Sequence, residues 1–233
     1  MNTAVNKTVS EFEKNLLKMK QLYLSTERQF IEFNEIIPYT QNDPAKGWNE
    51  IHSPRLVNLI LSICPQIEKI SKLLLSELDL VPENNGRSSY DYLNRLDRKK
   101  LLTIQHVGMA NPGSVNILLQ PFLKNSDNIE WWFAYNKIKH DIIEGIDYGT
   151  LSNTINALAG LSILHHIAYT ILTFKHYAGV SWEDEILDSE KWFFDEEQGL
   201  AFQHPDEKLF PNQLSVVWSS KIFFFCNHRI KGV

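Results

Sequence analysis

The sequence predicts a mainly α protein, a helical bundle of about four to five helices with small β elements between and after the helices. Three segments predict long helices: residues 10–37 and 55–78 are amphipathic, and residues 151–174 are apolar on nearly every side. Hydrophobic residues make up 43% of the chain and charged residues 22%, which is typical of globular proteins and excludes wholesale disorder. At 233 residues, the chain is long enough to bury a sizeable core.

The first two helices follow from the spacing of their apolar residues. In residues 10–37, apolar side chains recur at steps of three and four, so they share one face of a helix. The second helix has a clear beginning, because Ser53 is a typical N-cap and Pro54 suits the first helical position. Its apolar face continues with Leu56, Leu59, Ile60, Ile63, Ile67, Ile70, Leu74 and Leu78.

The segment 151–174 has the length of a membrane span, but its composition favours a buried bundle helix. Asn153, Asn156, His165 and His166 interrupt the apolar run, and the chain has no second candidate span, so we expect no membrane association. Adjacent histidines on a helix point about 100° apart, so they cannot bind one metal ion without outside ligands. We therefore expect neither a metal site nor a cofactor.

Short β-prone runs are expected in two parts of the chain. Residues 101–105 and 115–119 flank a glycine-containing loop and predict a hairpin. Residues 192–194 and 200–202 are rich in aromatic side chains and predict two strands around a turn. Residues 222–225 form a further β-prone run. These elements are the small β component of the predicted fold.

The composition of the chain changes near residue 179, which suggests a division into two parts. Residues 1–178 are expected to form the helical bundle domain, and residues 179–233 a β-rich C-terminal appendage packed on it. The appendage has more aromatic side chains than a minor layer needs. This aromatic C-terminal region is therefore a candidate surface for a protein partner.

Several classes of function are excluded or limited by composition. The two cysteines, Cys64 and Cys226, provide neither a disulfide framework nor a zinc pattern. The chain contains no Gly-rich phosphate loop and no Gly-x-Ser-x-Gly elbow, which excludes the standard nucleotide-binding and serine-hydrolase sites. A net charge of -5 gives no general attraction for polyanions, so an RNA site would have to be a local basic patch. The N-terminus lacks an apolar signal core, so we expect a cytoplasmic protein.

A helix beginning at Trp131 carries the most informative side chains. Its apolar side is expected to face the core and consists of Trp131, Ala134, Tyr135, Ile138 and Ile142. Its other side collects Trp132, Asn136, Lys139, His140 and Ile143. A histidine beside an amide and a lysine can transfer a proton on a phosphate ester, because its pKa lies near neutrality and the lysine attracts anions. The alternative is a core helix whose histidine makes only a structural hydrogen bond.

The residues Tyr135-Asn136-Lys137-Ile138-Lys139-His140 resemble the Arg-Asn-x-x-x-His signature of the HEPN superfamily. These helical domains occur in bacterial toxins, abortive-infection proteins and CRISPR-associated nucleases. Asn136 and His140 match the signature, and Tyr135 stands at its arginine position. The resemblance covers a little under half of the chain. It implies a homodimer that cleaves RNA without metal, in which His140 is the acid or base and Asn136 orients it.

Tyr135 leaves two functions open, because replacing the arginine removes a permanent positive charge and a bidentate fork for phosphate. The preferred interpretation is a non-catalytic or weakly catalytic HEPN-like protein that binds RNA or a protein partner, in bacterial defence or a toxin–antitoxin pair. It would form a homodimer through the face with Asn136 and His140. The alternative is a metal-independent endoribonuclease in which Lys139 takes part of the missing charge role.

Two further expectations concern the surroundings of this helix. HEPN-like sites often include a polar residue from a neighbouring helix, so Glu68 is a candidate partner of His140; the alternative is a surface carboxylate paired with a nearby lysine. A third function, a small-molecule enzyme, would need a deep pocket lined by Trp131, Trp132 and Tyr169.

Overall fold

The computed structural model describes residues 11–36, 47–78, 89–97, 102–103, 105–109, 117–124, 128–173 and 222–225. Its helices are α1 (Glu11–Ile36), α3 (Pro54–Glu77), α4 (Ser89–Leu96), α5 (Glu130–His140) and α6 (Leu151–Thr173), with a 3₁₀-helix η2 (Ile146–Tyr148) between the last two. Three short strands are β1 (Val107–Met109), β2 (Ile117–Leu119) and β3 (Phe223–Phe225). The predicted mainly helical fold with small β elements is confirmed.

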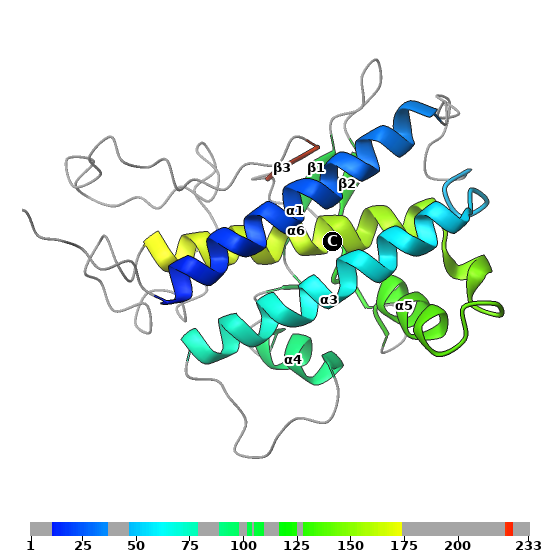
Figure 1. Ribbon diagram of the computed structural model, residues 1–233. Coiled ribbons are helices and arrows are strands. Elements are labelled where there is room, and N and C mark those ends of the chain that lie inside the picture. Colours follow the sequence, from blue (N-terminus) through cyan, green and yellow to red (C-terminus); the bar gives the residue numbers. More distant parts are fainter. Residues whose placement is uncertain are drawn as a thin grey trace, which may run out of the picture.

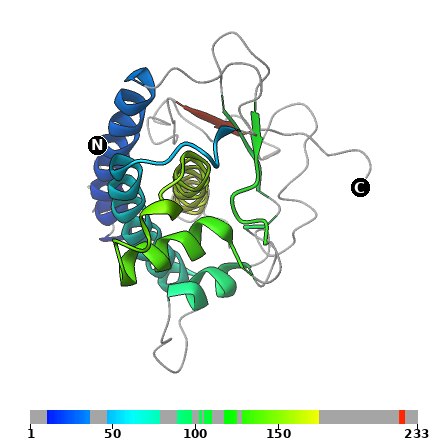
Figure 2. The same ribbon diagram turned by 90° about the vertical axis from the view of Figure 1, so that its right-hand side faces the viewer.

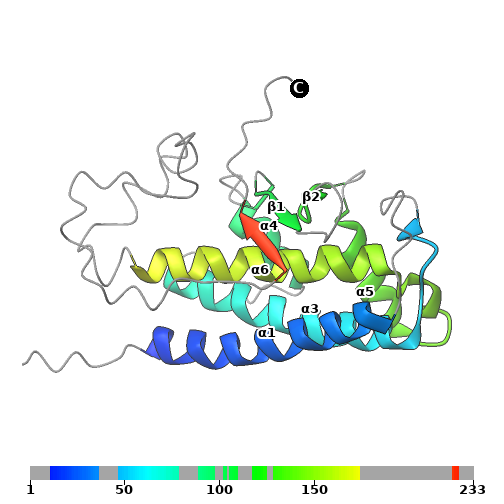
Figure 3. The same ribbon diagram turned by 90° about the horizontal axis from the view of Figure 1, so that it is seen from above.

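Helix α6 is the centre of the fold. Helices α1 and α3 run alongside it, and the small sheet lies on the side of α6 away from α3 (Figures 1, 2 and 3). Helices α1, α3 and α5 all contact α6. Because α6 has neighbours on every side, residues on all its faces are buried, including the polar Asn153, Thr154, Ser162 and His165. The prediction of a buried bundle helix for this segment is confirmed.

Within the described ranges, none of the helices combines the length and apolar character that crossing a membrane requires.

The start of α3 is fixed by the cap that the sequence predicts. The side-chain oxygen of Ser53 accepts a hydrogen bond from the backbone N–H of Leu56 at 3.3 Å, and Pro54 is the first helical residue. This start is tied to the start of α6, because the backbone N–H of Leu151 donates to the carbonyl of Ile51 at 2.8 Å. Helices α3 and α6, which pack against each other in the core, therefore begin from one hydrogen-bonded junction.

The three strands form one antiparallel sheet in the order β2-β1-β3. Strand β2 lies within the predicted run 115–119, and β3 lies within the predicted run 222–225. The β3 strand therefore joins the hairpin strands β1 and β2, although it comes from the predicted C-terminal appendage. The predicted strands 192–194 and 200–202 lie outside the described residues. So does the predicted boundary between residues 178 and 179, and the two-part division stays a prediction.

The predicted position of the first hairpin strand, residues 101–105, is wrong. Residues 102–103 form a turn, and the strand begins only at Val107. One carboxylate oxygen of Asp97 accepts from the backbone N–H groups of Leu102 (3.1 Å) and Thr103 (2.9 Å), and from the Thr103 hydroxyl (3.1 Å). These three hydrogen bonds hold the chain in a turn after α4, because a short acidic side chain competes well for local backbone donors.

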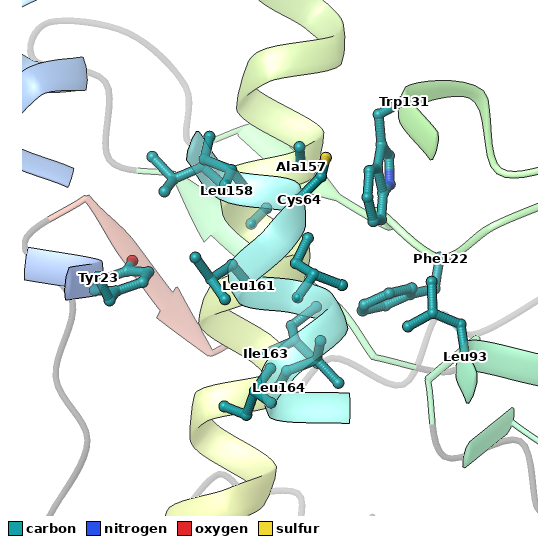
Figure 4. Close-up of a cluster of buried hydrophobic side chains, with 14 of the residues drawn as sticks. Tyr23, Cys64, Leu93, Phe122, Trp131, Ala157, Leu158, Leu161, Ile163 and Leu164 are labelled. Carbon is teal, nitrogen blue, oxygen red and sulfur yellow. The ribbon is translucent and has the colours of Figure 1, made fainter. Parts of the chain in front are cut away.

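The core gathers side chains from all five described helices around α6 (Figure 4). Trp131 of α5 packs edge-on against Phe122, with 6.0 Å between ring centroids. Its indole N–H donates to the carbonyl of Pro121 at 2.6 Å, so this buried polar atom has a partner. Gly160 of α6 lets both rings approach, since a Cβ there would lie 3.2 Å from Phe122 Cζ and 3.4 Å from Trp131 Cζ2.

Candidate functional site

Helix α5 presents its predicted apolar face to the core with two differences. Trp131, Ala134, Tyr135 and Ile138 are buried as expected, but Trp132 is buried too and Ile142 is exposed. Trp132 was expected on the open side; it packs between its aromatic neighbours, with ring centroids 5.6 Å from Trp131 and 5.2 Å from Tyr135. Ile142 lies beyond the helix, which ends at His140.

The signature residues Asn136 and His140 differ in their environments. His140 is the last residue of α5 and is exposed to solvent. Asn136 is half-buried, and its side-chain amide donates to the carbonyl of Trp132 at 3.1 Å. In the part of the chain that the structure describes, no hydrogen bond joins Asn136 to His140. The Asn136 amide is thus hydrogen-bonded within its own helix, whereas the His140 imidazole is exposed at the end of α5.

Glu68 of α3 does reach α5, and there it contacts two of the predicted site residues. The hydroxyl of Tyr135 donates to Glu68 Oε1 at 3.3 Å, and Lys139 Nζ lies 3.8 Å from the same oxygen. The Lys139 ammonium also lies 5.2 Å from the centre of the Tyr135 ring. The structure therefore brings Glu68, Tyr135 and Lys139 together, while His140 lies outside this group.

The electrostatics of this group favour a structural link between α3 and α5. Burial, and then the charge of Glu68, raise the pKa of the Tyr135 hydroxyl above its ordinary value, so it stays a neutral donor. Burial raises the pKa of the Cys64 thiol well above its usual range, Glu68 raises it further, and Lys139 opposes the shift. Neither group is an activated nucleophile or base at neutral pH. Tyr135 packs where the HEPN signature has its cation.

A second feature of this end of α5 is a surface that sequence reasoning missed. Five large apolar side chains are exposed on α5, the following turn and η2: Phe133, Ile142, Ile143, Ile146 and Tyr148. We call them the α5–η2 patch. Ile143 is 82% exposed, and the rings of Phe133 and Tyr148 meet edge-on with 5.9 Å between centroids. The sequence contained one signal of this surface, the adjacent isoleucines that come just before a turn bounded by glycines.

The shape of the patch depends on a tight return of the chain after α5. A carboxylate oxygen of Asp141 accepts from the backbone N–H groups of Ile143 (2.9 Å) and Glu144 (3.1 Å). At Gly145, a Cβ would lie 2.6 Å from the Asp141 carbonyl oxygen and 2.6 Å from Ile138 Cα. Because both atoms belong to the backbone, no side-chain movement could make room, and only glycine fits. The turn therefore holds Ile142 and Ile143 outward beside His140.

The sequence raises the question of two other kinds of site: a metal site, and a deep pocket for a small molecule. Among the described residues, no group of three or more His, Cys, Asp or Glu side chains could hold a metal ion. A cavity of about 370 Å³ has Trp131 in its wall, but neither Trp132 nor Tyr169 lines it. This cavity is therefore not the pocket that a small-molecule enzyme was expected to need.

The comparisons with known proteins add no assignment. No protein-family model, no curated protein and no solved structure matches this chain.

Proposed function

We propose that this protein is a non-catalytic, HEPN-like interaction module that forms a homodimer through the α5–η2 patch. The observation that carries the proposal is the exposure of five large apolar side chains in one continuous segment, residues 133–148. Single exposed hydrophobic residues are ordinary on protein surfaces, but a contiguous group is typical of a binding surface. Aromatic and aliphatic side chains of this size are also those that anchor interfaces.

A second copy of the chain is the occupant that the charges around the patch favour. The last turn of α5 carries the basic Lys137, Lys139 and His140, and the segment after it carries the acidic Asp141, Glu144 and Asp147. In a twofold interface, residue i of one copy contacts residue j of the other and residue j contacts residue i, so a basic end of the patch can face the acidic end of its copy. When two copies of the patch pair, the basic groups of one copy can therefore face the acidic groups of the other.

RNA is a less favourable occupant on the same grounds. The negative end of the α5 dipole and three exposed acidic side chains lie beside His140, and both repel phosphate. The nearest cation of the group, Lys139, is shared with Glu68. Tyr135 supplies no positive charge. One observation supports the alternative, a metal-independent endoribonuclease: His140 is exposed on a helix end with Lys137 and Lys139 one turn or less away.

The dimer is tested by placing a charge at the centre of the patch. We expect wild-type protein to have a dimeric mass by sedimentation equilibrium, and Ile143→Asp to be monomeric, because an unpaired carboxylate would be buried in the interface. Leu22→Asp is the matched control: Leu22 is 56% exposed on α1, away from the patch, and this variant should remain dimeric. A monomeric wild type, or equal behaviour of the two variants, would contradict the proposal.

The catalytic alternative is tested by RNA cleavage with EDTA present. We expect neither wild type nor His140→Ala to cleave structured or single-stranded RNA, because Tyr135 provides no phosphate clamp. His140 is exposed, so its replacement should leave thermal stability nearly unchanged and the two proteins can be compared at equal folding. Cleavage by wild type that disappears in His140→Ala would replace the interaction module with a ribonuclease.

A further inference from the structure

A cavity of about 370 Å³ lies beside the start of α5, between the segment after β2 and the first turns of α6. Three of the side chains in its wall are carboxamides: Gln120 comes from the segment after β2, and Asn153 and Asn156 come from α6. The volume is at the small end of the range for ligand pockets, so it suits a molecule of metabolite size. A carboxamide has two N–H donors and an oxygen acceptor, so these side chains make the wall polar without adding charge.

Each of the three carboxamides is held in place by a hydrogen bond to the protein. The amides of Asn153 and Asn156 each donate to a backbone carbonyl at 2.9 Å, and the Gln120 amide nitrogen is hydrogen-bonded to His106. One such bond leaves the second N–H and the oxygen of each amide for a ligand. Because these side chains are already oriented, a ligand can bind them with little further loss of side-chain entropy.

The two charged side chains in the wall have opposite signs. Lys124 donates to Asn94 Oδ1 at 3.0 Å and keeps its positive charge, and Glu130 adds a negative charge. Both side chains are exposed, so solvent and salt screen their fields. The wall therefore has no net charge and favours neither anions nor cations. Its donors and acceptors suit a neutral ligand that both donates and accepts hydrogen bonds.

We propose that this cavity binds a neutral monosaccharide, whose hydroxyl groups form hydrogen bonds with Gln120, Asn153 and Asn156. A hydroxyl group donates and accepts at one atom, so it can pair with either the N–H or the oxygen of a carboxamide. A sugar ring carries several hydroxyl groups that point in different directions, which matches carboxamides from two separate segments of the chain. A ligand with a single amide group has too few hydrogen-bonding atoms to satisfy all three.

The rest of the wall is compatible with a sugar ring. Leu123, which is 61% exposed, lines the cavity and offers apolar surface to the C–H groups of the ring. None of the lining residues belongs to the α5–η2 patch, so the proposal does not rest on the homodimer.

Saturation-transfer NMR of the full chain with glucose, galactose, mannose and ribose tests this site. We expect saturable binding of at least one of these sugars at millimolar concentration. Derivatives of the bound sugar that carry a carboxylate or an amine in place of one hydroxyl group should bind no more tightly, because the charges of the wall balance each other.

Two variants locate the binding in the cavity. Asn156→Leu should weaken sugar binding about tenfold, because it removes the donor and the acceptor of one amide at nearly constant volume. Gln120→Leu changes a different segment and should have the same effect, so the test does not depend on the folding of one variant. Asn58→Leu is the matched control: Asn58 is exposed on α3 and does not line the cavity, and this variant should bind as the wild type does.

Three outcomes would overturn the proposal. They are no saturable binding of any sugar of the panel at millimolar concentration, tighter binding of a charged derivative than of the neutral sugar, and unchanged affinity in both Asn156→Leu and Gln120→Leu. The first would mean that the cavity holds only water.

Discussion

Replacing Trp131 by alanine should lower the free energy of unfolding by about 3–5 kcal/mol, the usual cost of emptying a large aromatic site in a core. Trp131 is 2% exposed, packs on Phe122 and Trp132, and ties α5 to the segment after β2 through its hydrogen bond to Pro121. Gly160, which lies opposite, has no side chain that could move into this space. Urea denaturation followed by circular dichroism measures the change.

Two comparison variants separate volume from hydrogen bonding in this result. Trp131→Phe keeps an aromatic ring but leaves the buried Pro121 carbonyl without its donor, so we expect an intermediate loss. Leu22→Ala shortens a side chain on α1 that is 56% exposed and is not part of the α5–η2 patch, and should cost less than about 1 kcal/mol. A Trp131→Ala variant no less stable than Leu22→Ala would show that Trp131 is not a core residue.

Acidification should destabilise the wild type by about 2 kcal/mol more than a His165→Gln variant between about pH 7 and about pH 5. His165 is fully buried in α6, with its ring 5.4 Å from that of Tyr23. Burial, and then the nearby charge of Lys20, lower its pKa from 6.5 to about 3. In an unfolded chain the histidine has an ordinary pKa near 6.5.

The sign of this effect follows from which state takes up the proton. Below about pH 6.5 the unfolded chain binds a proton at His165, whereas the folded chain binds it only near pH 3. The free energy of unfolding therefore falls as the pH falls through that window. The neighbouring His166, whose pKa desolvation lowers to about 4, is present in both proteins and cancels in the comparison. Urea midpoints with the same slope against pH in both proteins would contradict a neutral, buried His165.

The helices were predictable because their signals are local. The periodicity of α1 and α3 and the Ser53 cap depend on residues within a few positions of each other, and α6 is recognisable because it is apolar all round. The start of β1 could not be predicted in this way. Asp97 holds residues 102–103 in a turn through side-chain hydrogen bonds, which the spacing of apolar residues does not reveal. Secondary structure was therefore missed where a side chain competes for the backbone.

The candidate site was only partly predictable for a different reason. A helical wheel correctly placed Tyr135 on the core side, but it assigns one side as buried and the other as open. Trp132 is buried nevertheless, because Trp131 and Tyr135 extend the aromatic layer around the helix. Glu68 was selected from the sequence, yet its contacts with Tyr135 and Lys139 depend on how α3 and α5 cross, which no local pattern contains.

The pairing of β3 with β1 has a consequence for the order in which the protein folds during synthesis. More than 100 residues separate Met109 from Phe223, its partner in the sheet. At a translation rate of about 5–20 residues per second, β1 leaves the ribosome roughly 6–23 s before β3 exists. Helices α3 and α6 can pack during that delay, whereas the edge of β1 that pairs with β3 stays unpaired. The nascent chain is therefore vulnerable to wrong pairing at this edge, and among the parts that the structure describes the sheet is the last to be completed.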